Sequence, residues 1–197
     1  RACADLLPSL QSLTLNTNGF LPERVRDMAE EISLILAKKR VIFNVSLSVD
    51  GVGKIHDRVR GVPGAFEKTA KTLSLLKELQ ERGGLRLFLS AVISRTNITG
   101  IRDLMKWAER EGVELVFAAV GFHDSFVANR NREAEIGLQG CLGEFLELVE
   151  TLARPRHLLD FQSFYWHDMM RFYRDGKRRK VPCPLSVESV VLDSVGD

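Results

Sequence analysis

Four polar residues recur at every second position of an otherwise apolar run, FNVSLSVD. They are Asn44, Ser46, Ser48 and Asp50. Because side chains alternate sides along a β-strand, these four share one face, and the apolar residues between them share the other. A parallel strand buried on both faces would instead be a continuous apolar run. Amide, hydroxyl and carboxylate groups aligned in this way are suited to holding a polar ligand by hydrogen bonds.

A second group of chemically capable side chains follows directly, namely His56, Asp57, Arg58 and Arg60. Histidine and carboxylate side chains are the usual carriers of protons in catalysis, so this cluster is one candidate for acid–base chemistry. The competing interpretation is structural, because Asp57 and Arg60 can form an ion pair that fixes a loop or clamps it to the sheet. We favour the ion pair and assign no catalytic residue.

The overall composition is that of an ordinary globular protein. The chain has 197 residues, of which 45% are hydrophobic and 27% are charged, and its net charge is +2. This small charge argues against nucleic acid or an anionic membrane as the partner, and no apolar run approaches the roughly 20 residues of a membrane span. Three widely spaced cysteines argue against a disulfide framework and for a reducing, cytoplasmic environment.

The polar row must be positioned by a repeating strand–helix unit. Strands are predicted at 12–17, 41–50, 85–94 and 113–122, and helices at 22–39, 64–82 and 97–112, the last with Thr99 as its N-cap. Such alternation indicates parallel strands with helices packed outside, in either an open doubly wound sheet or a (β/α) barrel. In an open sheet the polar row would lie unpaired under helices, at about 1–3 kcal/mol for each group. In a barrel it faces the lumen, so we predict a barrel.

The pattern changes after Phe122. Residues 133–152 predict an amphipathic helix, and an aromatic-rich helical stretch begins at Pro155. We therefore expect a barrel portion over 1–122, a helical segment over 123–180 that completes or flanks it, and a further segment over 181–197.

Two stretches, LNTNGF and SLSVDGVGKIHDRVRGVPGAFEKT, resemble the radical S-adenosylmethionine (SAM) superfamily over roughly residues 13–122. The resemblance is greatest to the branch with a cysteine-rich C-terminal extension, called SPASM or twitch. It implies a partial (β/α)6 TIM-like barrel with outer helices and a helical linker into that extension. Cys183, followed by twelve residues and Gly196, is similar to the start of the extension.

The chain departs from the family pattern in two places. It contains no Cys-x3-Cys-x2-Cys motif, which holds the catalytic [4Fe-4S] cluster in the family. It also lacks the Gly-Gly-Glu segment that holds the SAM amino group. We expect both upstream of Arg1, in a longer protein.

The resemblance implies that polar groups at the strand ends bind SAM. Ser48 and Asp50 match positions that meet the ribose diol, and Ser94 or Arg95 matches the position that pairs with the methionine carboxylate. Thr17 and Asn18 end the preceding strand and are expected to contact the same ligand. The alternative for Asp50 is a turn role, since Asp-Gly favours tight turns. Cys183 is expected to ligate an auxiliary Fe–S cluster, with an ordinary unligated cysteine as its alternative.

The implied function is that of a radical SAM enzyme, an oxidoreductase or a maturase. It would cleave SAM reductively to a 5′-deoxyadenosyl radical, which abstracts hydrogen from an unknown substrate, with a peptide or protein as the candidate class. An electron donor is the expected partner. Two alternatives stay open. One is a cluster-free barrel aldolase or isomerase, disfavoured because no strand end offers a lysine suited to Schiff-base chemistry. The other is a non-catalytic barrel that binds peptide or RNA through the basic run 177–180.

Overall fold

The computed structural model of the chain describes residues 9–122, 129–154 and 161–177. The chain forms two compact units, residues 1–140 and 141–197, and each is described by itself. The predicted boundaries at 122 and 180 stay predictions, and the segment 181–197 lies outside the described residues.

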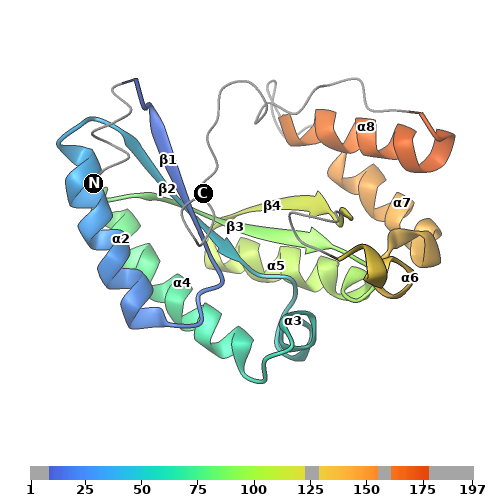
Figure 1. Cartoon of the computed structure of the whole chain (residues 1–197), viewed down its shortest axis with the longest axis horizontal. Helices are drawn as coiled ribbons and strands as arrows, with labels where there is room; N and C mark the ends of the chain where they lie inside the picture. The colour runs from blue at the N-terminus through green and yellow to red at the C-terminus, as the bar shows by residue number, and fades with distance from the viewer. Residues whose placement is uncertain (1–8, 123–128, 155–160, 178–197) are drawn as a thin grey trace. The chain divides into compact units, whose positions relative to one another are not determined.

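The first unit contains a four-stranded parallel sheet in the order β1-β2-β3-β4 (Figure 1). The strands are β1 (Ser12–Thr17), β2 (Ile42–Ser48), β3 (Arg86–Ile93) and β4 (Glu114–Ala119). Each strand pairs with the next one in sequence, as expected for right-handed strand–helix–strand units. All carboxyl ends therefore lie at the same edge of the sheet.

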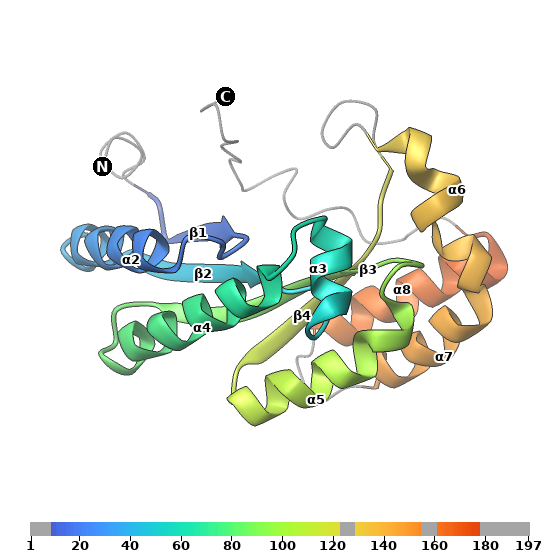
Figure 2. The same cartoon turned by 90° about the horizontal axis from the view of Figure 1, so that it is seen from below.

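Three helices cover one face of this sheet, as Figures 1 and 2 show. They are α2 (Pro22–Ala37), α4 (Ala65–Glu81) and α5 (Ile101–Glu111). Pro22 begins α2, where its missing N–H has no intrahelical role. Gly112 ends α5 in the left-handed conformation, with φ of +66°. Both termini agree with the sequence prediction.

The two faces of the sheet differ in chemistry. On the helix-covered face, the apolar residues of β2, β3 and β4 are buried: Phe43, Val45, Leu47, Leu87, Leu89, Ala91, Ile93, Leu115 and Phe117. The other face carries polar side chains beside the apolar side chains of Phe88, Val92 and Val116, and its central polar positions are half-buried or exposed except for Ser46. We call it the open polar face. It confirms the predicted α/β class and is consistent with a partial barrel.

Three local predictions are wrong. The stretch after β2 is not only a loop but contains a short helix, α3 (Lys54–Arg60). Thr99 is not the N-cap of α5, because a 3₁₀ turn over Ile98–Gly100 leads into the helix and Gly100 occupies the cap position. The predicted helix at 133–152 is interrupted, since Gly137 is extended, and it divides into shorter pieces.

Those pieces begin in the first unit with a 3₁₀ turn (Arg130–Arg132), helix α6 (Glu133–Ile136) and a second 3₁₀ turn (Leu138–Cys141), which ends at the boundary between the units. The second unit pairs α7 (Leu142–Leu152) with α8 (Phe161–Asp175). Phe145 of α7 is fully buried and meets Trp166 and Tyr173 of α8 edge-to-face. The aromatic-rich stretch is thus mainly a packing face. None of the helices within the described ranges is long and apolar enough to cross a membrane.

Candidate functional site

The open polar face is ordered by the strand register. Asn16 of β1 aligns with Ser46 of β2, and Ser48 of β2 aligns with Ser90 of β3. The Ser46 hydroxyl donates a hydrogen bond of 2.9 Å to that of Ser90, which ties two strands together across the face. Within the described part of the chain, the half-buried Ser48 hydroxyl makes no hydrogen bond. Ser48 therefore offers a donor and an acceptor at the carboxyl end of this face.

The turn after β1 is held by hydrogen bonds between side chains and backbone groups. The Thr17 hydroxyl accepts from the Gly19 N–H at 3.1 Å, and the Asn18 side chain accepts from the Phe20 N–H at 3.1 Å. On α4, Thr69 donates to the Asn18 carbonyl at 3.0 Å and Thr72 donates to the Gly19 carbonyl at 2.6 Å. The register pairs Thr17 with buried Leu47, on the helix-covered face. Asn16 is thus the last β1 residue on the open polar face.

The Asp50 carboxylate is enclosed by protein groups just beyond β2. One oxygen accepts from the Val92 N–H of β3 at 3.0 Å, and the other lies 2.8 Å from Nε of Arg60 on α3. The arginine contact is an ion pair whose N–H is not aligned for a hydrogen bond. The Asp50 side chain is only 4% exposed. Arg60 therefore clamps α3 to the strand ends, and the predicted Asp57–Arg60 pair is replaced by Asp50–Arg60.

Asn97 holds the chain just after β3. Its amide nitrogen donates to the carbonyls of Asp50 and Val92, at 2.8 and 2.9 Å. Its amide oxygen accepts from the Ser94 N–H at 2.8 Å and from the Ser94 hydroxyl at 3.2 Å. Asn97 is fully buried and Ser94 nearly so. Every hydrogen-bonding position of this amide is therefore used.

His56 of α3 lies in the middle of these strand ends and is fully buried. Its Nδ1 accepts from the Asp50 N–H at 3.0 Å, and its Nε2 lies 3.4 Å from the Thr69 hydroxyl. The rings of Phe20 and Phe66 contact it edge-on. Burial, with the nearby Arg60 cation second, lowers the pKa of His56 below its usual value. His56 is therefore neutral at neutral pH, with its proton on Nε2.

Asp57 has a capping role. Its two oxygens accept from the N–H groups of Gly64 and Phe66, at 2.8 and 2.9 Å, at the start of α4. These bonds, the one from Phe66 first, lower the pKa of Asp57. A carboxylate at a helix N-terminus is also favoured by the helix dipole. His56, Asp57 and Arg60 thus all make structural contacts, although Arg60 pairs with Asp50 rather than with Asp57 as predicted.

Arg95 is exposed and follows β3 directly. Its backbone N–H donates to the Ile136 carbonyl at 3.0 Å, which fixes the C-terminal end of α6 to the end of β3. Its guanidinium lies so close to Gly140 that a Cβ added to this glycine would come within 3.0–3.1 Å of the guanidinium atoms. Arg95 therefore lies at the same edge of the sheet as Ser94 and Ser48.

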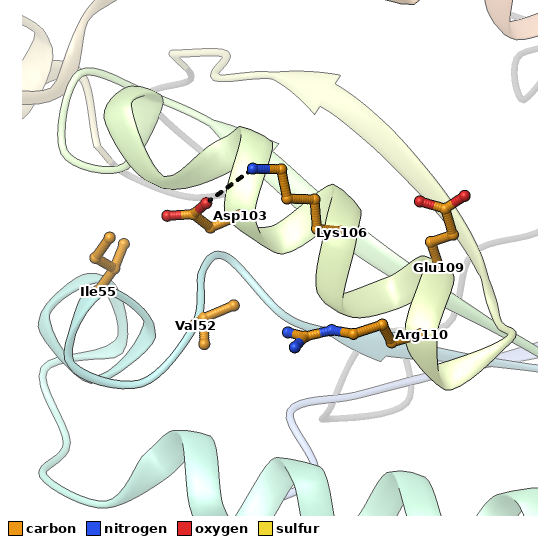
Figure 3. Close-up of a pocket in the computed structure, with 6 residues that line it drawn as sticks. All are labelled: Val52, Ile55, Asp103, Lys106, Glu109 and Arg110. Atoms are coloured by element: carbon orange, nitrogen blue, oxygen red, sulfur yellow. Dashed lines mark ion pairs between the residues drawn. The ribbon is translucent and has the colours of Figure 1, made fainter.

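Figure 3 shows a groove on the outer side of the unit, between α3 and α5. Val52 and Ile55 line it on one side, and the α5 side chains Asp103, Lys106, Glu109 and Arg110 line it on the other. None of the predicted cofactor residues lines this groove. Its charges of both signs on an exposed helix face are typical of solvated surface, so we place the site at the strand ends instead.

No group of three or more His, Cys, Asp or Glu side chains able to hold a metal ion occurs among the residues that the structure describes. Cys183, the predicted ligand of an auxiliary cluster, lies outside those residues, as does Cys3.

Comparison with known proteins gives three curated relatives. The chain is 30% identical over 105 residues to the AdoMet-dependent heme synthase of Oleidesulfovibrio alaskensis. It is 30% identical over 128 residues to the enzyme of the same name from Nitratidesulfovibrio vulgaris, and 32% identical over 94 residues to the pre-heme d1 synthase of Dinoroseobacter shibae. The matches cover 53%, 64% and 45% of this chain.

These relatives support a protein of the radical SAM superfamily. The matches span only 24%, 30% and 20% of the three relatives, so the chain corresponds to less than a third of each. No family model matches the chain. Among solved structures, anSMEcpe with bound AdoMet and the Kp18Cys peptide is 18% identical and has a TM-score of 0.51. The match covers 84% of this chain and 43% of that one, and it supports the α/β fold of parallel strands alternating with helices.

The structure brings together most of the predicted contact residues. Ser48, Asp50, Ser94 and Arg95 all lie at the carboxyl edge of β2 and β3, and Thr17 and Asn18 lie at that of β1. Their binding roles stay predictions. Sequence reasoning missed Asn16, which shares the open polar face with Ser46. Only the strand register reveals Asn16, because TLNT does not stand out as a polar row.

We predict that acid destabilises the protein partly through His56. Its pKa is lower in the folded protein than the unfolded value of about 6.5. Below that value the unfolded chain binds more protons, so the free energy of unfolding falls as pH drops from about 6.5 to the folded pKa, by at most about 1.4 kcal/mol per pH unit. Urea unfolding between pH 7.5 and 5 measures this loss.

The control is His56→Asn, which keeps an acceptor for the Asp50 N–H but does not titrate. This variant is expected to show a shallower decline of the free energy of unfolding than the wild type. Equal slopes for the two proteins would show that His56 is not the group responsible.

Proposed function

We propose that this protein is a radical SAM enzyme and that the carboxyl edge of β1, β2 and β3 binds S-adenosylmethionine. The observation that carries the proposal is the open polar face, which ends in a Ser48 hydroxyl uncommitted within the described residues. A hydroxyl at this position suits a ribose diol, because it both donates and accepts. The relatives named AdoMet-dependent heme synthases support the same cofactor.

In this proposal each predicted contact has a distinct task. Ser48 meets the ribose, and Arg95 pairs with the methionine carboxylate through its fork of N–H groups. Ser94 and the Thr17–Asn18 turn border the ligand. Asp50 supports the edge from behind, because both of its oxygens already have protein partners. The [4Fe-4S] cluster must be held by residues outside those present here, since the chain has no Cys-x3-Cys-x2-Cys motif.

When bound, the cluster and SAM together would supply a 5′-deoxyadenosyl radical, formed with methionine as one electron enters from a donor, and the radical would take a hydrogen atom from the substrate. The protein's own residues orient the cofactor and exclude water. We place the enzyme in the cytoplasm, as its sparse cysteines predict.

Two substrate classes compete. A peptide or protein is the class that the sequence resemblance suggests. A heme precursor is favoured by the names of all three relatives, two heme synthases and a pre-heme d1 synthase. The two classes are distinguished by incubating the reduced enzyme with each of them. The substrate is the class that stimulates formation of 5′-deoxyadenosine.

The test of cofactor binding uses the full reading frame, expressed anaerobically and reconstituted with iron and sulfide. We expect Ser48→Ala to weaken SAM binding about five- to tenfold, which corresponds to one lost hydrogen bond of about 1 kcal/mol. Arg95→Gln is expected to weaken it more than tenfold, since a charge-assisted bond is stronger. Equilibrium binding of SAM measures both.

The matched control is Ser12→Ala, which removes a serine hydroxyl from the amino end of β1 rather than from the carboxyl edge. It is expected to leave SAM binding unchanged. An iron-free, colourless preparation, or equal loss in Ser12→Ala and Ser48→Ala, would contradict the proposal.

A further inference from the structure

Three buried polar side chains connect the ends of three neighbouring strands. They are Thr69 of α4, His56 of α3 and Asn97 after β3, and each is 0% exposed. We call them the strand-end network. None of the three belongs to the predicted cofactor contacts.

The link from β1 to β2 passes through Thr69 and His56. The Thr69 hydroxyl donates to the Asn18 carbonyl at 3.0 Å, sharing its proton with the Ala65 carbonyl at 2.9 Å. Because Nδ1 of His56 accepts from the Asp50 N–H, the imidazole proton resides on Nε2, which faces the Thr69 oxygen at 3.4 Å. The turn after β1 and the chain after β2 are therefore joined by side chains of two helices.

The link from β2 to β3 passes through Asn97. Its amide spans the Asp50 carbonyl on one side and Val92 and Ser94 on the other, by four hydrogen bonds. The Asp50 carboxylate adds a parallel bond to the Val92 N–H. The ends of β2 and β3, which carry Ser48 and Ser94, are thus fixed relative to each other beyond the last backbone hydrogen bonds between the two strands.

Apolar residues would fill these three positions without the cost of burying polar groups. Polar side chains instead fix direction and distance, because a hydrogen bond has a preferred length and weakens steeply at poor angles. Predicted cofactor contacts lie on all three connected strand ends. A ligand bound by several strand ends binds more tightly when the spacing of those ends is fixed in advance, because no free energy is then spent on ordering them.

We propose that Thr69, His56 and Asn97 are positioning residues for the SAM-binding edge, which hold the ends of β1, β2 and β3 at the spacing that the cofactor requires. This inference rests on the proposed function. It assigns a role to residues that do not touch the cofactor. It predicts that replacing these residues weakens SAM binding more than the accompanying decrease in protein stability explains.

The test replaces one atom of the network in the full-length, cluster-reconstituted protein. Thr69→Val keeps the shape of the side chain but removes the hydroxyl, which leaves the Asn18 carbonyl and the His56 Nε2–H without this partner. Thr69→Ser keeps the hydroxyl and loses a methyl group. We expect SAM to bind about fivefold or more weakly to the valine variant, on the scale of one hydrogen bond, and within about twofold of wild type to the serine variant.

A second pair controls for general destabilisation. Asn97→Ala breaks the β2–β3 link, whereas Leu104→Ala opens a cavity under α5 at a residue that is likewise 0% exposed. At a temperature where urea titration shows both variants folded, we expect weaker SAM binding in Asn97→Ala only.

The outcomes separate the two proposals. If wild-type protein binds no SAM, the proposed function fails and this inference fails with it. If wild-type protein binds SAM but Thr69→Val matches Thr69→Ser, or Asn97→Ala matches Leu104→Ala, the positioning role alone is overturned.

Discussion

Replacing Gly19 with alanine is expected to lower the free energy of unfolding by about 2–5 kcal/mol. Gly19 has φ of +72°, a left-handed conformation that costs a residue with a Cβ about 1–2 kcal/mol. The added Cβ would also lie 2.7 Å from Cδ1 of Leu47, a fully buried core residue, and such overpacking costs about 1–3 kcal/mol. Urea unfolding of both proteins at neutral pH measures the difference.

Gly83 supplies the matched control. Its φ is +75°, but a Cβ there would meet nothing within 4 Å. Gly83→Ala should therefore show only the backbone cost of about 1–2 kcal/mol. If the two variants lose the same stability, the turn after β1 is not packed against the core as described.

The second large effect is expected at Asp50. Asp50→Ala should cost about 3 kcal/mol of unfolding free energy, because it leaves the Val92 N–H and the Arg60 guanidinium without their buried partner. The value lies at the low end for buried pairs, since the Arg60 side chain is 28% exposed. Chemical denaturation gives the loss directly.

Two comparisons test the cause of that loss. The double variant Asp50→Ala/Arg60→Ala should be less destabilised than the sum of the single variants, because the two side chains interact. Asp103→Ala removes an exposed carboxylate 3.9 Å from Lys106 and should cost less than about 0.5 kcal/mol. A small loss in Asp50→Ala, similar to that in Asp103→Ala, would mean that Asp50 does not clamp the strand ends.

Much of the fold follows from alternation along the strands. The polar row of Asn44, Ser46 and Ser48 correctly predicted that, among the described residues of the first unit, helices cover β2 on one side only. The helix α3 was missed because seven residues rich in charge carry too little apolar periodicity to be read as a helix. The start of α5 was misplaced because Thr99 has a capping residue type but lies inside a 3₁₀ turn.

The site was predictable in outline and not in its connections. Matching the family pattern gave Ser48 and Arg95, which lie at the same edge of the sheet. The predicted partner of Arg60, Asp57, was wrong. In the sequence an Asp57–Arg60 ion pair looks as favourable as an Asp50–Arg60 pair, and only the fold brings Asp50 close to Arg60. The connecting roles of His56 and Thr69 were missed because their neighbours are charged, which suggests surface positions until the helices are placed.

The contrast between the two faces of β2 also restricts how related proteins can differ in length. Inserting or deleting one residue within this strand would turn Val45 and Leu47 toward the polar side and bring serines under the helices. The connections between helices and strands, such as 82–85, carry no such constraint, because an added residue there leaves the alternation intact. Length variation among homologues should therefore be confined to the connections and absent from β2.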